Sequence, residues 1–115
     1  MRNGAINENR LYTRVQGNLS VFVYYNDRLI STCPCIDISI GGIKLETEDL
    51  GLSVNSLVEI RFDVDDTYQL NDVILPAIVK RISQGQIALA FEMLEKATEQ
   101  IIQQELVVQI GNKNN

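Results

Sequence analysis

The sequence contains no histidine and no tryptophan, and only two of its 115 residues are cysteine. Without histidine, the chain lacks both the usual general base for a serine or cysteine nucleophile and a common ligand of structural zinc. No hydrophobic run approaches the roughly 20 residues that a membrane-spanning helix needs. The N-terminus, Met1–Ala5, has no apolar core of a signal peptide. We therefore expect a cytoplasmic protein that is not an enzyme, holds no metal and does not insert into a membrane.

Acidic side chains outnumber basic ones by 15 to 10, which gives a net charge of −5. This balance argues against a DNA- or RNA-binding protein, because such proteins need a basic face against phosphates. The charge is uneven along the chain. Residues 1–14 carry three arginines and one glutamate, a net charge of +2, whereas residues 15–115 carry seven basic and 14 acidic side chains, a net charge of −7. A short basic arm therefore precedes an acidic body.

The two cysteines, Cys33 and Cys35, lie two positions apart and would share one face of a β-strand. A structural zinc site usually needs four ligands, and a cysteine pair in the cytosol is normally reduced. We interpret them as inert strand residues, with redox or metal chemistry as the alternative.

Six segments alternate between apolar and polar residues or are rich in β-branched and aromatic residues, which predicts strands. They are residues 19–25, 29–39, 43–47, 57–64, 73–82 and 87–93. Asn26-Asp27 reads as a hairpin turn between the first two segments. Pro34 and Pro76 each indicate a strand edge or a bulge. In the last segment we place Met93 on the same inward face as Ile87.

From Glu95 the apolar period changes to that of an amphipathic helix, predicted over residues 95–109. Its apolar face is assigned to Ala97, Ile101, Ile102, Leu106 and Val108. We expect an all-β fold, a six-stranded antiparallel β-barrel with a C-terminal α-helix over one opening. Residues 1–115 form one domain in this prediction, and the polar residues 1–13 are expected to be a mobile arm.

The stretch Asp37–Gly42 combines polar side chains with a pair of glycines. Strict alternation assigns two faces, with Cys35, Asp37 and Ser39 on one and Ile36, Ile38 and Ile40 on the other. The buried isoleucines would leave a carboxylate and a hydroxyl side by side. Gly41 and Gly42 would let the chain turn through positive φ or approach another group closely. The alternative is a strand that ends in a glycine turn with a solvated aspartate and serine.

Near the N-terminus, Arg10 and Arg14 lie four positions apart. On a helix they would share a face, and in an irregular arm they could converge on a ligand from either side. They could also be two solvated arginines.

Together, the two stretches resemble the PilZ domain family, whose hallmark is Arg-x-x-x-Arg followed by Asp/Asn-x-Ser-x-x-Gly. Here these residues are Arg10, Arg14, Asp37, Ser39 and Gly42. The resemblance implies a bacterial, non-enzymatic receptor for cyclic di-GMP, with these five residues at the ligand and no other cofactor.

Two positions depart from the family pattern. Asn9 stands where many members have a further arginine, a position that helps to decide whether one nucleotide or a stacked pair binds. Ala88 stands where the last strand often has glycine. Asn9 and Gly41, as neighbours of the motif residues, are further candidates for ligand contact.

These residue types suit the expected ligand. An arginine fork matches both the O6/N7 edge of guanine and phosphate oxygens. Asp37 can accept from guanine N1–H and N2–H₂, Ser39 can donate to an oxygen, and Gly42 would keep the strand surface clear. We expect the ligand to order the arm and thereby signal to a downstream partner protein. The alternatives are an adaptor of the same fold that does not bind the nucleotide, and a small oligonucleotide-binding barrel.

Overall fold

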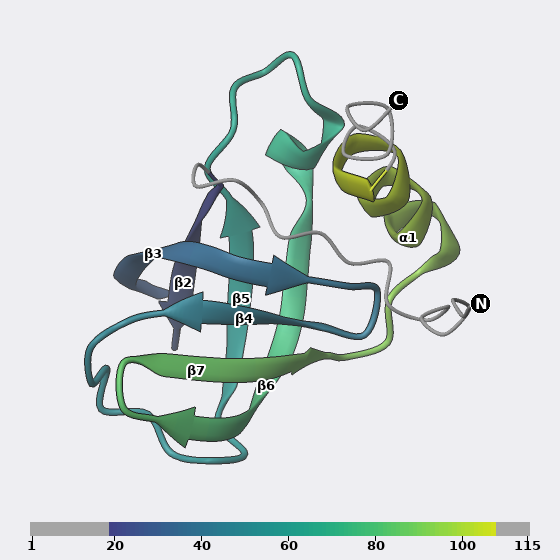
Figure 1. The fold of residues 1–115 in the computed structure, drawn as a ribbon. Coiled ribbons are helices and arrows are strands. Elements are labelled where there is room, and N and C mark those ends of the chain that lie inside the picture. The colour runs from purple at the N-terminus through teal and green to yellow at the C-terminus, as the bar shows by residue number, and fades with distance from the viewer. Residues whose placement is uncertain (1–18, 108–115) are drawn as a thin grey trace, which may run out of the picture.

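The computed structural model describes residues 19–107, which form a closed barrel of six strands with a short helix beside it (Figure 1). The strands are β2 (Ser20–Tyr25), β3 (Arg28–Ile38), β4 (Gly42–Glu46), β5 (Leu57–Phe62), β6 (Ile74–Ser83) and β7 (Gln86–Phe91). Their order around the barrel is β2-β3-β4-β7-β6-β5, and every neighbouring pair is antiparallel. The predicted fold class and all six strands are confirmed.

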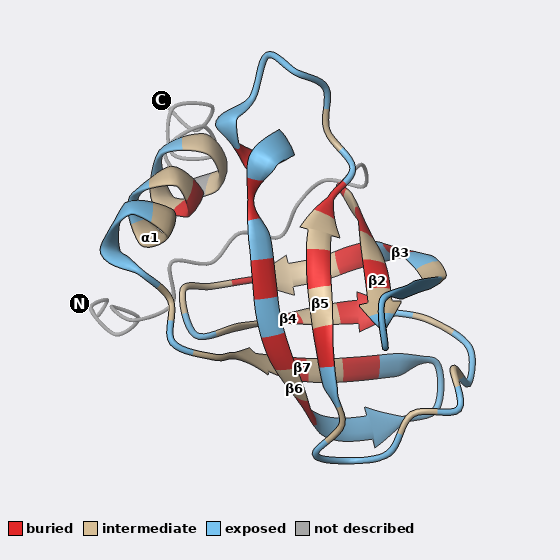
Figure 2. Ribbon diagram, turned by 180° about the vertical axis from the view of Figure 1, so that it is seen from behind, coloured by how far each residue is buried: buried red, intermediate tan, exposed pale blue. Residues whose placement is uncertain are grey.

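The core fills the barrel with alternate residues from each strand, as Figure 2 shows along β6. In β5, Val58, Ile60 and Phe62 are buried while the residues between them are not. In β2, Val21 and Val23 are fully buried. Period-two burial is what a sheet with one solvated face requires.

The turn between β2 and β3 consists of Asn26 and Asp27, with φ angles of 53° and 66°. Positive φ at both positions matches a type I′ turn, and asparagine and aspartate tolerate that region better than other non-glycine residues. The predicted hairpin is confirmed without a glycine.

Each proline lies one residue before the position at which the register with one neighbouring strand begins. Pro34 pairs with Ser20 of β2, but the register between β3 and β4 begins only at Cys35. Pro76 pairs with Glu59 of β5, and the register between β6 and β7 begins at Ala77. Because proline has no N–H to donate, each one sits where the ladder does not require a donor.

The predicted faces of β3 are wrong in part. Cys33, Cys35 and Ile38 are all buried, whereas strict alternation would separate Cys35 from Ile38. The register with β4 shifts between Cys35 and Asp37, so Ile36 is an extra residue that is only half-buried. A β-bulge of this kind changes which face the following side chains occupy. Both thiols are free and buried, in agreement with cysteines that serve packing.

Two further expectations fail near the C-terminus. Met93 is 90% exposed, because β7 ends at Phe91 and the chain turns away with Met93 at a φ of 43°. The helix α1 spans Lys96–Ile102 and continues as π-helix over Gln103–Val107, so it is not one α-helix to residue 109. Ala97 is exposed instead of facing the core. Val108 lies outside the described residues.

The helical segment is attached to the barrel by Ile102, with Ile101 and Leu106 packed against the core, and by one carboxylate. Ile102 is fully buried in the core cluster, which also contains Leu70 of the 3-10 helix Gln69–Asp72. The Glu105 carboxylate accepts backbone N–H groups of Gln69 and Leu70, at 2.8 and 2.9 Å. It therefore satisfies two donors that a short helix leaves without a partner.

Candidate ligand-binding site

The end of β3 and the start of β4 are joined by a tight turn with three defined hydrogen bonds. The Ser39 N–H donates to the Gly42 carbonyl at 2.9 Å, and the Gly41 N–H donates to the Ser39 hydroxyl oxygen at 3.1 Å. The Phe91 N–H of β7 donates to the Gly41 carbonyl at 3.0 Å. The turn is thus fixed to β7 as well as to itself.

The two glycines of this turn have different structural roles. A Cβ atom on Gly42 would collide with the backbone carbonyl oxygen of Leu89 in β7, whereas one on Gly41 would meet only the Ser39 hydroxyl, at 3.8 Å. Neither glycine has a positive φ. A glycine is therefore needed at position 42 because the backbone approaches β7 closely. Close approach to another group was one of the two roles expected for this glycine.

Asp37 lies on the outer wall of the barrel in a row of cross-strand neighbours. It pairs with Lys44 of β4, Lys44 pairs with Ala88 of β7, and Ala88 pairs with Arg81 of β6. Buried sequence neighbours, among them Ile38 and Leu45, turn Asp37, Lys44 and Ala88 outward, and Arg81 is exposed and pairs with Ala88. Neighbouring strands are about 4.8 Å apart. The row therefore runs from the Asp37 carboxylate through Lys44 and the small Ala88 to Arg81.

The polar groups at this wall are available for a ligand. Among the residues the structure describes, the Asp37 carboxylate forms no hydrogen bond or ion pair. The Ser39 oxygen already accepts the Gly41 N–H, so its own O–H is left to donate. Burial, and secondarily the charge of Asp37, raise the pKa of the Cys35 thiol to about 12. That cysteine is protonated and unreactive at neutral pH.

The structure brings together only part of the predicted site. Asp37, Ser39, Gly41 and Gly42 lie within one short stretch, whereas Asn9, Arg10 and Arg14 lie outside the described residues. The sequence motif does not include Lys44 and Arg81. Only the strand order β4-β7-β6 could have revealed them, because Lys44 and Arg81 are far apart in the chain.

Within residues 19–107, no group of three or more histidine, cysteine, aspartate or glutamate side chains could hold a metal ion. In the same part of the chain, no helix is long and apolar enough to cross a membrane.

Comparisons with solved structures support the fold. The chain resembles the PilZ domain of CeSA from a cellulose synthesizing bacterium, with a TM-score of 0.62 and 21% identity over 90% of this chain and 98% of that one. It resembles the Legionella uncharacterized protein Lpg0364, with a TM-score of 0.53 and 14% identity over the same shares of the two chains. The apo structure of MrkH from K. pneumonia gives a TM-score of 0.62 and 18% identity, over 88% of this chain and 51% of MrkH.

A search of curated protein sequences finds no match. The PilZ domain profile, by contrast, matches residues 8–107, nearly the whole chain. Together with the barrel and the turn between β3 and β4, this match shows that the chain belongs to the PilZ domain family, a family of cyclic di-GMP receptors that are not enzymes.

Proposed function

We propose that this protein is a receptor for cyclic di-GMP that transmits the signal to a partner protein. The observation that carries the proposal is the outward Asp37 carboxylate, which is unpartnered among the described residues and lies two residues from a Ser39 hydroxyl whose O–H is left to donate. A guanine presents two donors, N1–H and N2–H₂, to such a carboxylate. Arg10 and Arg14, the other motif residues, are assigned to the guanine O6/N7 edge and to the phosphates.

The charges on the barrel wall favour a dianionic ligand at this position. The protein carries a net charge of −5, which repels a dianion at long range. Lys44 and Arg81 on the outer wall reverse that sign locally. Ala88 between them leaves the surface low enough for a flat base or a sugar. We assign these two cations a supporting role toward phosphate.

The signalling step follows from where the two halves of the motif lie in the sequence. Asp37 and Ser39 belong to a rigid strand and turn, whereas Arg10 and Arg14 precede the barrel. One ligand contacted by both halves draws residues 1–13 onto the barrel wall, an order-on-binding step found in many regulatory proteins. The covered nucleotide and the arm together form the surface that the partner protein binds.

Calorimetric titration with cyclic di-GMP tests the receptor function. We expect saturable binding, and we expect cyclic di-AMP to bind far more weakly because adenine lacks the N1–H and N2–H₂ donors that Asp37 reads. Asp37→Ala should reduce the affinity for cyclic di-GMP by at least about tenfold, since a hydrogen bond to a charged group contributes roughly 1.5–3 kcal/mol.

The matched control is Asp63→Ala, which removes the same charge from an exposed aspartate beyond the end of β5. It should leave the affinity unchanged or slightly raised. Equal binding of the two dinucleotides would contradict the guanine-reading role of Asp37. Failure to bind cyclic di-GMP at all would leave the nucleotide-independent adaptor as the function of this fold.

A further inference from the structure

The N-terminal half of β3 has an edge that β4 does not cover. Among the described residues, the register of β4 with β3 runs only from Cys35 to Ile38, so residues 28–33 pair only with β2. The Cys35 N–H donates to Leu19, which precedes β2, at 2.8 Å. Backbone groups alternate in direction along a strand, so the N–H and C=O of Thr32 point to the uncovered side. These groups can pair with another strand.

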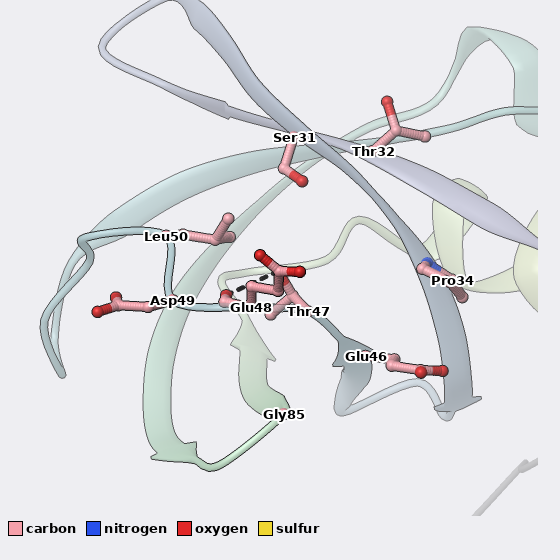
Figure 3. A pocket seen from close by; sticks show the side chains of 9 residues that line it. All are labelled: Ser31, Thr32, Pro34, Glu46, Thr47, Glu48, Asp49, Leu50 and Gly85. Atoms are coloured by element: carbon pink, nitrogen blue, oxygen red, sulfur yellow. Dashed lines mark hydrogen bonds between the residues drawn. The ribbon is translucent and has the colours of Figure 1, made fainter.

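Beside this edge lies an open hollow of about 460 Å³, shown in Figure 3 between the strand that carries Ser31, Thr32 and Pro34 and the segment from Glu46 to Leu50. Its lining includes three carboxylates, those of Glu46, Glu48 and Asp49, and no lysine or arginine. The Asp49 carboxylate accepts the Gly51 N–H. Those of Glu46 and Glu48 have no hydrogen-bond or ion-pair partner within residues 19–107.

We propose that this edge binds an extended basic segment of a partner protein as an added β-strand. In this mode of recognition, backbone hydrogen bonds to an uncovered edge supply affinity and alternate side chains supply specificity. The edge selects an extended chain. The carboxylates of Glu46 and Glu48 select lysine or arginine on the side of that chain that faces them.

Charge excludes a second copy of this chain as the occupant. Two copies joined edge to edge would bring both sets of Glu46, Glu48 and Asp49 together, in a protein whose net charge is already −5. Like charges placed opposite each other are destabilising. The proposal does not depend on nucleotide binding, because the hollow lies at the opposite end of the β3–β4 pair from the Ser39–Gly42 turn.

The test uses the whole protein and a capped octapeptide of alternating threonine and lysine, titrated by NMR with the amide signals as readout. We expect saturable shifts at Thr32 and Glu46, slower hydrogen exchange at the Thr32 amide, and weaker binding at higher salt. A threonine–glutamate octapeptide of the same length is the charge control and should not bind.

Backbone pairing is tested on the peptide, which avoids a protein variant that fails to fold. Two versions are N-methylated at alternate residues, one at every lysine and one at every threonine. Only one set of amides faces the edge, so we expect one version to lose at least about tenfold in affinity and the other to lose little. Equal affinity of the two versions would overturn the added-strand geometry.

The carboxylates are tested by the double variant Glu46→Gln/Glu48→Gln, against Asp63→Asn/Asp72→Asn, which makes the same change of charge at exposed residues elsewhere. The first should weaken peptide binding about tenfold and the second by much less. No binding at millimolar peptide overturns the proposal. Protection of the Thr32 amide that rises with protein concentration alone would overturn it in favour of self-association.

Discussion

The two ends of the β3–β4 pair differ in both backbone pairing and charge. At the Ser39–Gly42 end, the strands are joined by a turn that also bonds to β7, and Lys44 lies beside Asp37. At the other end the strands separate, and Glu46 and Glu48 border a hollow. Lys44 and Glu46 are only two residues apart on the same outward face of β4. One strand can therefore favour an anion at one end and a cation at the other.

The largest effect on stability is expected at the Ser39–Gly42 end of the β3–β4 pair. Gly42→Ala places a methyl group against the Leu89 carbonyl, so β4 and β7 must move apart. Overpacking of this kind lowers the free energy of unfolding by about 1–3 kcal/mol. Gly41→Ala is the matched control, since its Cβ meets only an ordinary contact at 3.8 Å. Urea denaturation of both variants measures the difference, and equal stability would mean that the β4–β7 spacing is not fixed by Gly42.

The second prediction concerns Cys35, where pairing between β3 and β4 begins. Its pKa is about 12 in the folded protein and 9.0 as an ordinary thiol. Above pH 9 the unfolded chain loses this proton while the folded protein keeps it, so stability falls as pH rises. The fall is about 1.4 kcal/mol per pH unit up to pH 12.

Other groups titrate in the same range, so the measurement is a comparison. Urea denaturation of the wild type and of Cys35→Ala at pH 8 and pH 10.5 should show that the wild type loses about 2 kcal/mol more than the variant. If the two proteins lose the same amount, the thiol ionises as readily in the fold as outside it.

The strands were predictable because each has a periodic apolar pattern. Val58, Ile60 and Phe62 in β5 define their face without any knowledge of a partner strand. The bulge at Ile36 was not predictable, because a bulge is defined by two residues opposing one on the neighbouring strand. The exposure of Met93 has a similar cause, since alternation continues in the sequence after the strand has ended.

Only the motif residues of the candidate site were predictable from the sequence. Asp37, Ser39 and Gly42 are close in the sequence, so local pattern was sufficient to group them. Lys44 and Arg81 lie on either side of Ala88 of β7. No local sequence pattern predicts the order of strands in a barrel, so these two residues could not be grouped. The steric reason for Gly42 likewise depends on a residue 47 positions away, Leu89.

The third prediction compares the two charges on β4. Lys44→Gln should weaken cyclic di-GMP binding about fivefold, because it removes a cation that attracts the phosphates of the ligand. On a partly exposed surface, an ion pair of this kind contributes roughly 1 kcal/mol. Glu46→Gln, at the other end of the strand, should leave affinity unchanged or slightly improved. Calorimetry at two salt concentrations checks both, and the Lys44 effect should shrink as salt rises. A larger loss of affinity from Glu46→Gln than from Lys44→Gln would indicate that the nucleotide binds at the Glu46 end of the β3–β4 pair.

The smallest losses of stability are expected when Ser31 on β3 and Ser39 in the turn that follows it are replaced by alanine. The Ser39 hydroxyl accepts the Gly41 N–H at 3.1 Å, whereas Ser31 accepts only the weak Cys33 S–H donor, at 3.6 Å. An exposed hydrogen bond contributes roughly 0.5–1 kcal/mol, because water can replace the lost partner. Ser39→Ala should therefore lower the free energy of unfolding by about 0.5 kcal/mol, and Ser31→Ala by less.

The same two variants separate stability from binding. Ser39→Ala should also weaken cyclic di-GMP binding by several-fold, because it removes an O–H donor whose oxygen is positioned by the Gly41 bond. Ser31→Ala should leave nucleotide affinity unchanged, since Ser31 lies at the open end of β3. Calorimetry and urea denaturation on the same samples provide both readouts. If Ser39→Ala lowers stability but leaves affinity intact, the hydroxyl serves only to fix the turn, and the ligand is held by Asp37 and the cations around it.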